Sequence, residues 1–198
     1  MASSISLRSK AMQVDAASIE HNVQVLRRGG VIAFPTEAVF GFGCDPQNVI
    51  AVQRVLHIKQ RNARQGLLLI AADFAQVAPY IADDCPSAAI EKAQASWPGP
   101  HTWVFPASGR APAWIKGDHN SIALRVTAHP VAAALCRSLE SPLVSTSANR
   151  HGAEPARTAS EVEREFGALV DAIVVGDVGE SESPTTIRDA VSGEWLRR

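Results

Sequence analysis

The strongest constraint on the fold is an alternation of helix-like and strand-like segments along nearly the whole chain. Apolar residues at helical spacing follow Asp15, the pair Gly29-Gly30 ends that pattern, and the short apolar run VIAF comes next. The pattern then repeats, with helical stretches at 48–61, 74–81, 87–97, 130–139 and 160–167, and strand-like runs at 66–72, 101–107, 121–126, 142–148 and 172–175. Such alternation predicts one α/β domain, although the order of its strands does not follow from the pattern.

Three local signals place the boundaries of individual elements. Asn48 is the expected N-cap of the helix that follows it, and Ser160 with Glu163 has the spacing of a capping box for a later helix. The C-terminal stretch is typical of a hairpin with Ser192-Gly193 at its turn.

Charge and composition narrow the classes of function. The chain has 198 residues, of which 46% are hydrophobic, and this is enough to bury a proper core. Its 19 Lys and Arg residues are balanced by 20 Asp and Glu residues, so no global field draws it towards nucleic acid. Any anion-binding site must therefore arise from a local concentration of positive charge.

The chain begins with the polar stretch MASSISLRSK, which lacks the apolar core of a secretory signal. We expect residues 1–14 to form a flexible arm and residues 15–198 to form the domain. Three widely spaced cysteines without a CxxC, and histidines without metal-ligand spacing, argue against a disulfide framework and a protein-held metal. No stretch approaches the roughly 20 apolar residues of a membrane helix, so we expect a cytoplasmic protein.

The segment KQRNARQG, residues 59–66, places Lys59, Arg61 and Arg64 close together with no acidic residue among them. One interpretation is a solvated helix end, where positive charge favours the helix dipole and its loss costs little stability. The other is a site for phosphates, since the loop runs straight into an apolar strand. The absence of GxxxxGK[ST] excludes a Walker-type nucleotide site.

Two further segments combine turn residues with polar side chains. PTEAVFGFGCD, residues 35–45, follows a strand, where ligand sites of α/β proteins gather, and an ordinary glycine turn is the alternative. Its GFG lacks the third glycine of a dinucleotide fingerprint. VSTSANRHG, residues 144–152, offers hydroxyls and an amide to phosphate or carboxylate oxygens, unless these groups satisfy only their own backbone.

Several short segments, each weak alone, occur in an order that is specific as a set: PTEAVFGFGCDP, KQR followed by GLLLI, WPGPHTWVFPA, ALRVTAHP, PLVSTSAN and SPTTIRDA. Together they resemble the YrdC-like family, specifically its short, single-domain bacterial threonylcarbamoyl-AMP synthases, over about residues 15–198. The resemblance implies an α/β fold with an open, twisted, mixed sheet that is flanked by helices and has a concave, basic face.

The resemblance also implies an activity. Such enzymes condense L-threonine, bicarbonate and ATP into threonylcarbamoyl-AMP and release pyrophosphate, with Mg²⁺ carried on the ATP phosphates. A separate downstream complex transfers the threonylcarbamoyl group to an adenosine beside the anticodon of certain tRNAs. Weak direct binding of tRNA stays open at this point.

By the same resemblance, two family motifs hold the nucleotide. The KxR motif falls on Lys59 and Arg61, which are expected to contact the phosphates as the catalytic pair. The hydroxyl-x-Asn motif falls on Ser147 and Asn149, and Thr102, behind a Pro-Gly-Pro turn, matches a further position that faces the nucleotide.

The positions that match the family's L-threonine site are Thr36, Arg125 and Thr185. Two positions depart from longer relatives, which have an Asn-Pro pair before the second strand and a histidine soon after it. Here Gln65-Gly66 and Ile70 stand in those places.

The main alternative is an RNA-binding module that uses the same basic face without adenylate synthesis. Lys59, Arg61, Arg64 and Arg125 could all contact a phosphate backbone. The balanced net charge and the lack of an aromatic stacking signature argue against it. A hydrolase or carbamoyl-transferring relative on the same scaffold is a third alternative, because a fold does not fix a function.

Overall fold

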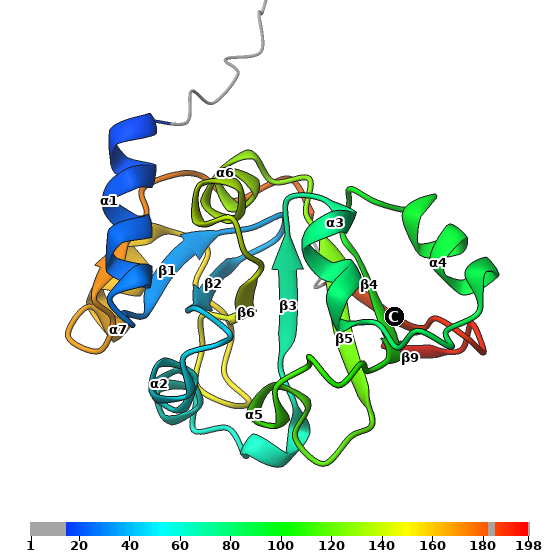
Figure 1. Ribbon diagram of the computed structural model, residues 1–198. Helices are drawn as coiled ribbons and strands as arrows, with labels where there is room; N and C mark the ends of the chain where they lie inside the picture. Colours follow the sequence, from blue (N-terminus) through cyan, green and yellow to red (C-terminus); the bar gives the residue numbers. More distant parts are fainter. Residues whose placement is uncertain (1–14, 182–184, 198) are drawn as a thin grey trace, which may run out of the picture.

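The computed structural model describes residues 15–181 and 185–197, so the arm expected at 1–14 lies outside the described residues. Within these ranges the chain forms one sheet of nine strands with helices on both of its faces (Figure 1). This confirms the α/β fold with an open mixed sheet. The concave, basic face stays a prediction.

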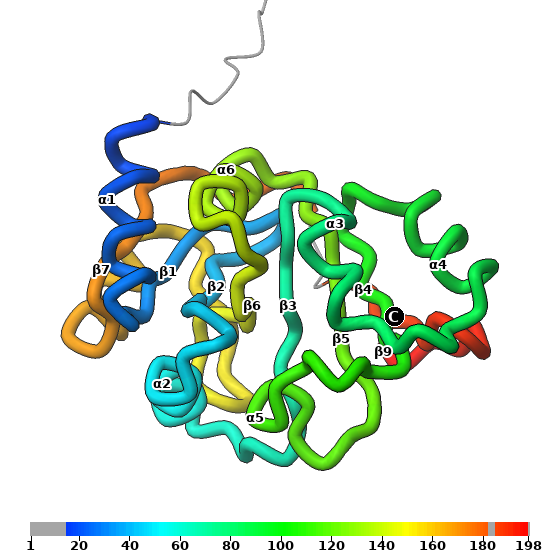
Figure 2. The backbone as a smooth tube through the Cα atoms, viewed as in Figure 1, coloured from blue at the N-terminus to red at the C-terminus, as the bar shows by residue number. Residues whose placement is uncertain are grey.

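The sheet mixes parallel and antiparallel neighbours. Its order is β7-β1-β2-β6-β3-β5-β4-β8-β9, with parallel pairs β1/β7, β3/β5 and β4/β8. The strands are β1 Ile32–Pro35, β2 Phe40–Gly43, β3 Leu68–Ala71, β4 His101–Pro106, β5 Ser121–Val126, β6 Leu143–Ser147, β7 Ala172–Ile173, β8 Thr186–Asp189 and β9 Trp195–Arg197. The last two form the predicted C-terminal hairpin, which is drawn in red beside β4 (Figure 2).

The helices follow the predicted order with one addition, α5. They are α1 Ala16–Arg27, α2 Val49–Lys59, α3 Phe74–Val77, α4 Ser87–Gln94, α5 Ala113–Lys116, α6 Pro130–Leu139 and α7 Ala159–Phe166, with 3-10 turns η1 Ala63–Gln65 and η2 Ala78–Tyr80. Asn48 caps α2 as expected, since its side chain accepts from Ala51 N at 3.1 Å. None of the helices in the described part of the chain has the length and apolar character that crossing a membrane requires.

The capping box of α7 was predicted at the wrong residues. Thr158, not Ser160, is the N-cap, and its hydroxyl accepts from Glu161 N at 3.2 Å. Glu161 in turn accepts from Thr158 N at 3.1 Å. Both spacings satisfy the same sequence rule, and the extended backbone at Thr158 decides between them because an N-cap must leave the helical conformation.

Segment 40–43 is a strand where an ordinary glycine turn was the favoured alternative. Strand β2 pairs antiparallel with both β1 and β6. Its glycines allow close packing, because a Cβ at Gly43 would lie 2.6 Å from Phe34 Cε1 and 2.9 Å from Val144 O. Gly41 and Gly43 therefore lie in a closely packed strand and not in a turn.

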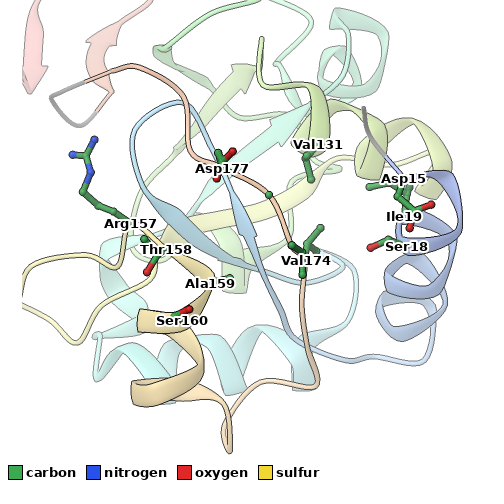
Figure 3. Close-up of a pocket in the computed structure, with 12 residues that line it drawn as sticks. Asp15, Ser18, Ile19, Val131, Arg157, Thr158, Ala159, Ser160, Val174 and Asp177 are labelled. Atoms are coloured by element: carbon green, nitrogen blue, oxygen red, sulfur yellow. The ribbon is translucent and has the colours of Figure 1, made fainter. Parts of the chain in front are cut away.

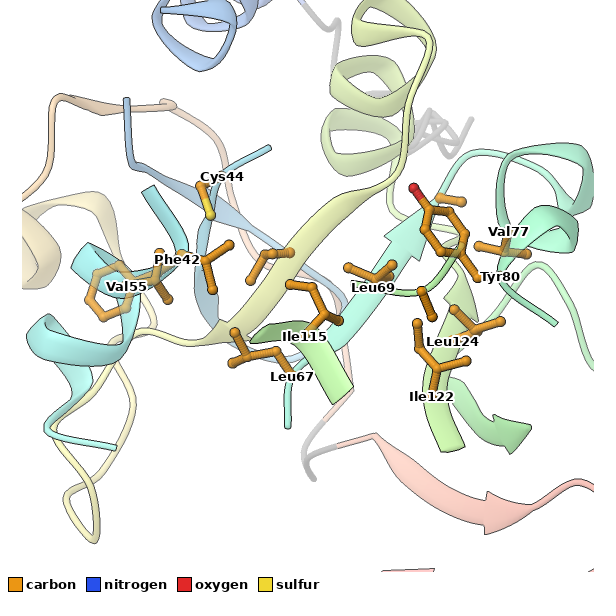
Figure 4. Packing of buried hydrophobic residues seen from close by; sticks show 14 of the residues in the cluster. Phe42, Cys44, Val55, Leu67, Leu69, Val77, Tyr80, Ile115, Ile122 and Leu124 are labelled. Atoms are coloured by element: carbon orange, nitrogen blue, oxygen red, sulfur yellow. The ribbon is translucent and has the colours of Figure 1, made fainter. Parts of the chain in front are cut away.

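Alternation along the strands separates two hydrophobic clusters on opposite faces of the sheet. On one face, Leu69 and Leu124 pack with residues of α2, α3, α4, α5 and α7 (Figure 4). On the other face, Ile70 and Leu143 pack with α1 and α6. Arg125 alternates with Leu124 and so lies on the second face, where the helices α1 and α6 supply the buried cover.

Candidate functional site

A cavity of about 520 Å³ lies on the sheet face that carries α1 and α6. Its floor comes from strands β2, β3, β4, β5, β6 and β8, and the segment 65–68 and α5 contribute one wall. Of the eight residues proposed from sequence, the cavity lining contains Thr36, Arg61, Arg125, Ser147, Asn149 and Thr185. Long-range strand pairing thus gathers segments that are far apart in the chain.

Lys59 is buried and does not line the cavity. Its ammonium donates to Ser147 O at 2.6 Å, to Asn149 Oδ1 at 2.6 Å and to Asn149 O at 3.1 Å. These contacts use all three N–H groups. Burial and, less strongly, the charge of Arg61 lower the pKa of Lys59 to about 8. The expectation of a solvated helix end is therefore wrong for this residue.

The two arginines of the same segment have different environments. Arg61 lines the cavity and donates from Nη2 to Gly66 O at 2.9 Å, while its buried Nε has no hydrogen-bond partner among the described residues. Burial lowers the pKa of Arg61. Arg64 is exposed and pairs with Asp118, so a distant acid neutralises it. Only Arg61 of this segment presents a cation to the cavity.

Ser147 and Asn149 both line the cavity, but their polar atoms also contact each other. Ser147 Oγ donates to Asn149 Oδ1 at 2.7 Å, and Asn149 Nδ2 donates to Ala153 O at 2.5 Å. The amide that sequence reasoning offered to a ligand is thus already hydrogen-bonded. The Ser147 hydroxyl keeps free acceptor capacity and can rotate towards a ligand.

The residues predicted for L-threonine, Thr36, Arg125 and Thr185, all belong to the cavity lining. Thr36 Oγ1 donates to Val39 O at 2.7 Å, which fixes the hydroxyl and leaves lone pairs to accept. Arg125 is buried and lies 3.3 Å from the Glu37 carboxylate, measured from Nη2 to Oε2. Thr185 is held through its carbonyl by the side chain of Arg197, at 2.7 Å from Nη2.

Thr102 is buried in β4 and does not belong to the cavity lining. It shares a strand face with Val104, which does line the cavity, and pairs with Ile187 of β8. Its hydroxyl has no hydrogen-bond partner among the described residues. The structure therefore places Thr102 on the cavity face of β4 but outside the lining.

Sequence reasoning missed Arg197. It comes from β9 at the C-terminus, lines the cavity and donates to Thr185 O. Burial and the charges of Arg125 and Arg61 lower its pKa, so three guanidinium groups converge on one cavity. The predicted hairpin was the available signal, but its place beside β4 could not be derived.

The two departures from longer relatives have different outcomes. Gln65 and Gly66 line the cavity, so side-chain or backbone atoms at these positions are within reach of a ligand there. Ile70 is fully buried in the cluster under α6 and cannot contact a ligand in the cavity.

A second cavity, of about 650 Å³, lies between α1 and α7 and contains none of the predicted residues (Figure 3). Asp15 and Ser18 of the α1 side face Thr158 and Ser160 of the α7 side across the segment that carries Val174. Over the described residues, no group of three His, Cys, Asp or Glu side chains could hold a metal ion. The polar side chains that line the first cavity include hydroxyls, amides and guanidinium groups, which suit a polyanion.

Comparison with known proteins gives a consistent family. The family model of the Sua5, YciO and YrdC domain, described as "Telomere recombination", matches residues 24–198. The chain is similar to the threonylcarbamoyl-AMP synthase of Halorhodospira halophila, 56% identical over 180 residues that cover 91% of this chain and 94% of that protein. The enzyme of the same name from Coxiella burnetii is 49% identical over 180 residues, 91% of this chain and 96% of that protein.

Two solved structures share the fold. P. abyssi Sua5 in complex with L-threonine has a TM-score of 0.83 at 31% identity, over 89% of this chain. The match covers 52% of that protein, so this chain spans about half of its length. E. coli YciO has a TM-score of 0.79 at 26% identity, over 93% of this chain and 92% of that protein.

Proposed function

The chain belongs to the Sua5, YciO and YrdC family, and from this premise we propose that it is a threonylcarbamoyl-AMP synthase. It condenses L-threonine, bicarbonate and ATP into threonylcarbamoyl-AMP and pyrophosphate. The observation that carries the proposal is the convergence of Thr36, Arg61, Arg125, Ser147, Asn149 and Thr185 on one cavity. These are positions that match the family's motifs, and they come from distant parts of the sequence.

The cavity divides by its chemistry. Arg61 and Arg197 supply positive charge for the ATP phosphates, and Ser147 supplies a hydroxyl beside them. Thr36, Arg125 and Thr185 take L-threonine, with the guanidinium of Arg125 on its carboxylate, because a guanidinium matches a carboxylate in charge and shape.

The remaining two predicted residues lie outside the lining. Lys59 is a positioning residue, since its ammonium orients Asn149 and the Ser147 carbonyl instead of facing the cavity. The buried Thr102 hydroxyl, which has no hydrogen-bond partner among the described residues, is a donor kept in reserve on the same strand face as the lining residue Val104.

The reaction needs these groups for electrostatic reasons. The amine of L-threonine and bicarbonate form a carbamate with loss of water, and a carbamate oxygen then attacks the α-phosphate as pyrophosphate leaves. Two anions must meet, so converging guanidinium groups lower the barrier by offsetting their repulsion. Holding three reactants in one cavity removes much of the entropic cost of bringing them together. No covalent side-chain nucleophile is required.

The wider context follows from the same proposal. Mg²⁺ enters on the ATP phosphates, since the described side chains that line the cavity carry hydroxyl, amide and cationic groups, whereas Mg²⁺ prefers carboxylates. The product is passed to a separate threonylcarbamoyl-transfer complex for modification of tRNA in the cytoplasm. Weak direct tRNA binding by the basic groups at the cavity is compatible with this scheme.

One measurement separates the proposal from its alternatives. Pure protein with Mg²⁺ and ATP should release pyrophosphate only when both L-threonine and bicarbonate are present, and mass spectrometry should detect threonylcarbamoyl-AMP. An RNA-binding module would release none, and a hydrolase would not require both co-substrates. Pyrophosphate at background level with all three substrates present would refute the synthase.

A further inference from the structure

A buried ion pair lies immediately behind the cavity. Arg125 of β5 lines the cavity, whereas Glu37, in the connection between β1 and β2, does not. Glu37 Oε2 lies 3.3 Å from Arg125 Nη2, and both side chains are almost fully buried. The carboxylate therefore pairs with a lining residue without lining the cavity itself.

The carboxylate of Glu37 is itself fixed in place. Its Oε1 accepts from Thr127 Oγ1 at 2.7 Å and from Ala128 N at 3.1 Å. Burial acts to raise the pKa of Glu37, but the charge of Arg125 and these hydrogen bonds outweigh it, and the pKa is lowered. Glu37 is thus ionised at neutral pH. Its Oε1 is hydrogen-bonded to the segment that follows β5, and its Oε2 has no hydrogen bond among the described residues and faces Arg125 as an ion pair.

The backbone around Glu37 is held independently of its side chain. Gly179 N donates to Thr36 O at 2.9 Å, and Ser181 N donates to Glu37 O at 3.0 Å. A Cβ at Gly179 would lie 2.7 Å from Glu37 O, so the two segments are in close contact. A change confined to the Glu37 carboxylate should therefore leave the Thr36 loop where it is.

We propose that Glu37 is a positioning residue for substrate recognition, which fixes the Arg125 guanidinium so that its remaining N–H groups receive the α-carboxylate of the amino-acid substrate. The proposal rests on the assignment of L-threonine to this cavity. Arg125 lines the cavity, and its buried Nε has no hydrogen-bond partner among the described residues, so the pair with Glu37 is the contact that orients the guanidinium. A guanidinium held at one edge loses less freedom when a carboxylate binds the other.

A purely structural role makes a different prediction. If Glu37 only neutralised a buried charge, its loss would lower stability and weaken every ligand of the cavity to a similar extent. If Glu37 orients Arg125, loss of Glu37 should lower the affinity only of ligands whose own carboxylate contacts Arg125. L-threonine and L-threoninol distinguish these two roles of Glu37. L-threoninol has a hydroxymethyl group in place of the α-carboxylate and keeps the amine and the side chain.

The test is calorimetric titration of both ligands into wild type and Glu37→Gln, without ATP. Asp171→Asn is the matched control, since it breaks an Arg–carboxylate pair with Arg54 that lies outside the cavity. We expect Glu37→Gln to bind L-threonine roughly 10-fold more weakly or worse, with L-threoninol affinity changed less than about twofold. Asp171→Asn should leave both affinities unchanged.

The outcomes distinguish a failure of the proposed function from a failure of the role proposed for Glu37. Wild type that binds no L-threonine overturns the proposed function and this inference with it. If wild type binds L-threonine and Glu37→Gln binds it equally well, the inference alone is overturned. The same holds if Glu37→Gln loses affinity equally for both ligands. If Glu37→Gln does not fold, Thr127→Val decides with the same two ligands, because it removes one hydrogen bond to Glu37 and keeps the charge. For Thr127→Val we expect a smaller loss of affinity, confined to L-threonine. Equal changes in the affinities for L-threonine and L-threoninol would overturn the inference.

Discussion

The Lys59 ammonium lies 2.6 Å from Asn149 Oδ1, and this contact ties a buried lysine to a residue of the cavity lining. Ser147 Oγ donates to the same oxygen at 2.7 Å, so one amide oxygen joins the end of α2 to the loop after β6. Lys59, which the family resemblance assigns to the phosphates, thus contacts two residues that line the cavity and is absent from the lining itself.

Removal of the Lys59 amine and its N–H donors should destabilise the protein. Lys59→Met keeps much of the side-chain volume but leaves Ser147 O, Asn149 O and Asn149 Oδ1 without their shared donor. Unsatisfied buried acceptors predict a loss on the order of 2–4 kcal/mol in the free energy of unfolding, measured by urea denaturation. Arg64→Met is the control and should change it by less than about 0.5 kcal/mol, because its ion pair is exposed. Equal stability of the two variants would contradict the role given to Lys59.

Nucleotide affinity should fall as the pH rises through about 8, where Lys59 loses its proton. The pKa is lowered from an ordinary value of 10.5, so between about 8 and 10.5 the unfolded state binds more protons and the Lys59 contribution to stability increases with pH. A loss of affinity in that window is therefore not a loss of fold; it follows from removing one N–H donor from the Ser147–Asn149 arrangement. Titration of a non-hydrolysable ATP analogue measures it, and Lys59→Met should lack the step. A step of equal size in Lys59→Met would assign it to another group.

Substitutions of Asn149 should separate support from ligand contact. Asn149→Asp keeps an acceptor for Lys59 and Ser147, whereas Asn149→Ala removes it, so the Asp variant should be the more stable of the two in thermal unfolding. ATP-analogue affinity should follow the opposite order, because the added charge lies at the cavity lining and repels phosphates. The defect of Asn149→Asp should also vary most with salt concentration. An Asp variant that binds as well as wild type would place the residue away from the phosphates.

The close packing of β2 predicts a strict requirement for glycine. Gly43→Ala places a Cβ 2.6 Å from Phe34 Cε1 and 2.9 Å from a backbone oxygen, and Phe34 is fully buried and cannot move freely. We expect a loss of about 1–3 kcal/mol in the free energy of unfolding. Gly109→Ala is the control, because a Cβ there meets nothing within 4 Å. Equal stability of both variants would show that β2 tolerates a wider spacing.

The elements that the sequence predicted well are those with a local cause. Apolar residues at helical spacing mark α1 and α2, and Asn48 caps α2 because a side chain next to a helix start can reach its N–H groups. β3 is apolar on both faces, which is typical of a buried strand. The ordered motifs also identified the family and six of the residues that line the cavity.

What only the tertiary structure decided are relationships between distant residues. The two glycines favoured an ordinary turn in the sequence, whereas the structure places them in β2, packed against Phe34 and Val144. The hairpin was visible in sequence, but pairing of β8 with β4 is what brings Arg197 to the cavity. Periodicity reports which face of an element is buried and is silent on which partner buries it. For the same reason the burial of Lys59 against Asn149, and of Arg125 against Glu37, follows from strand order and not from spacing along the chain.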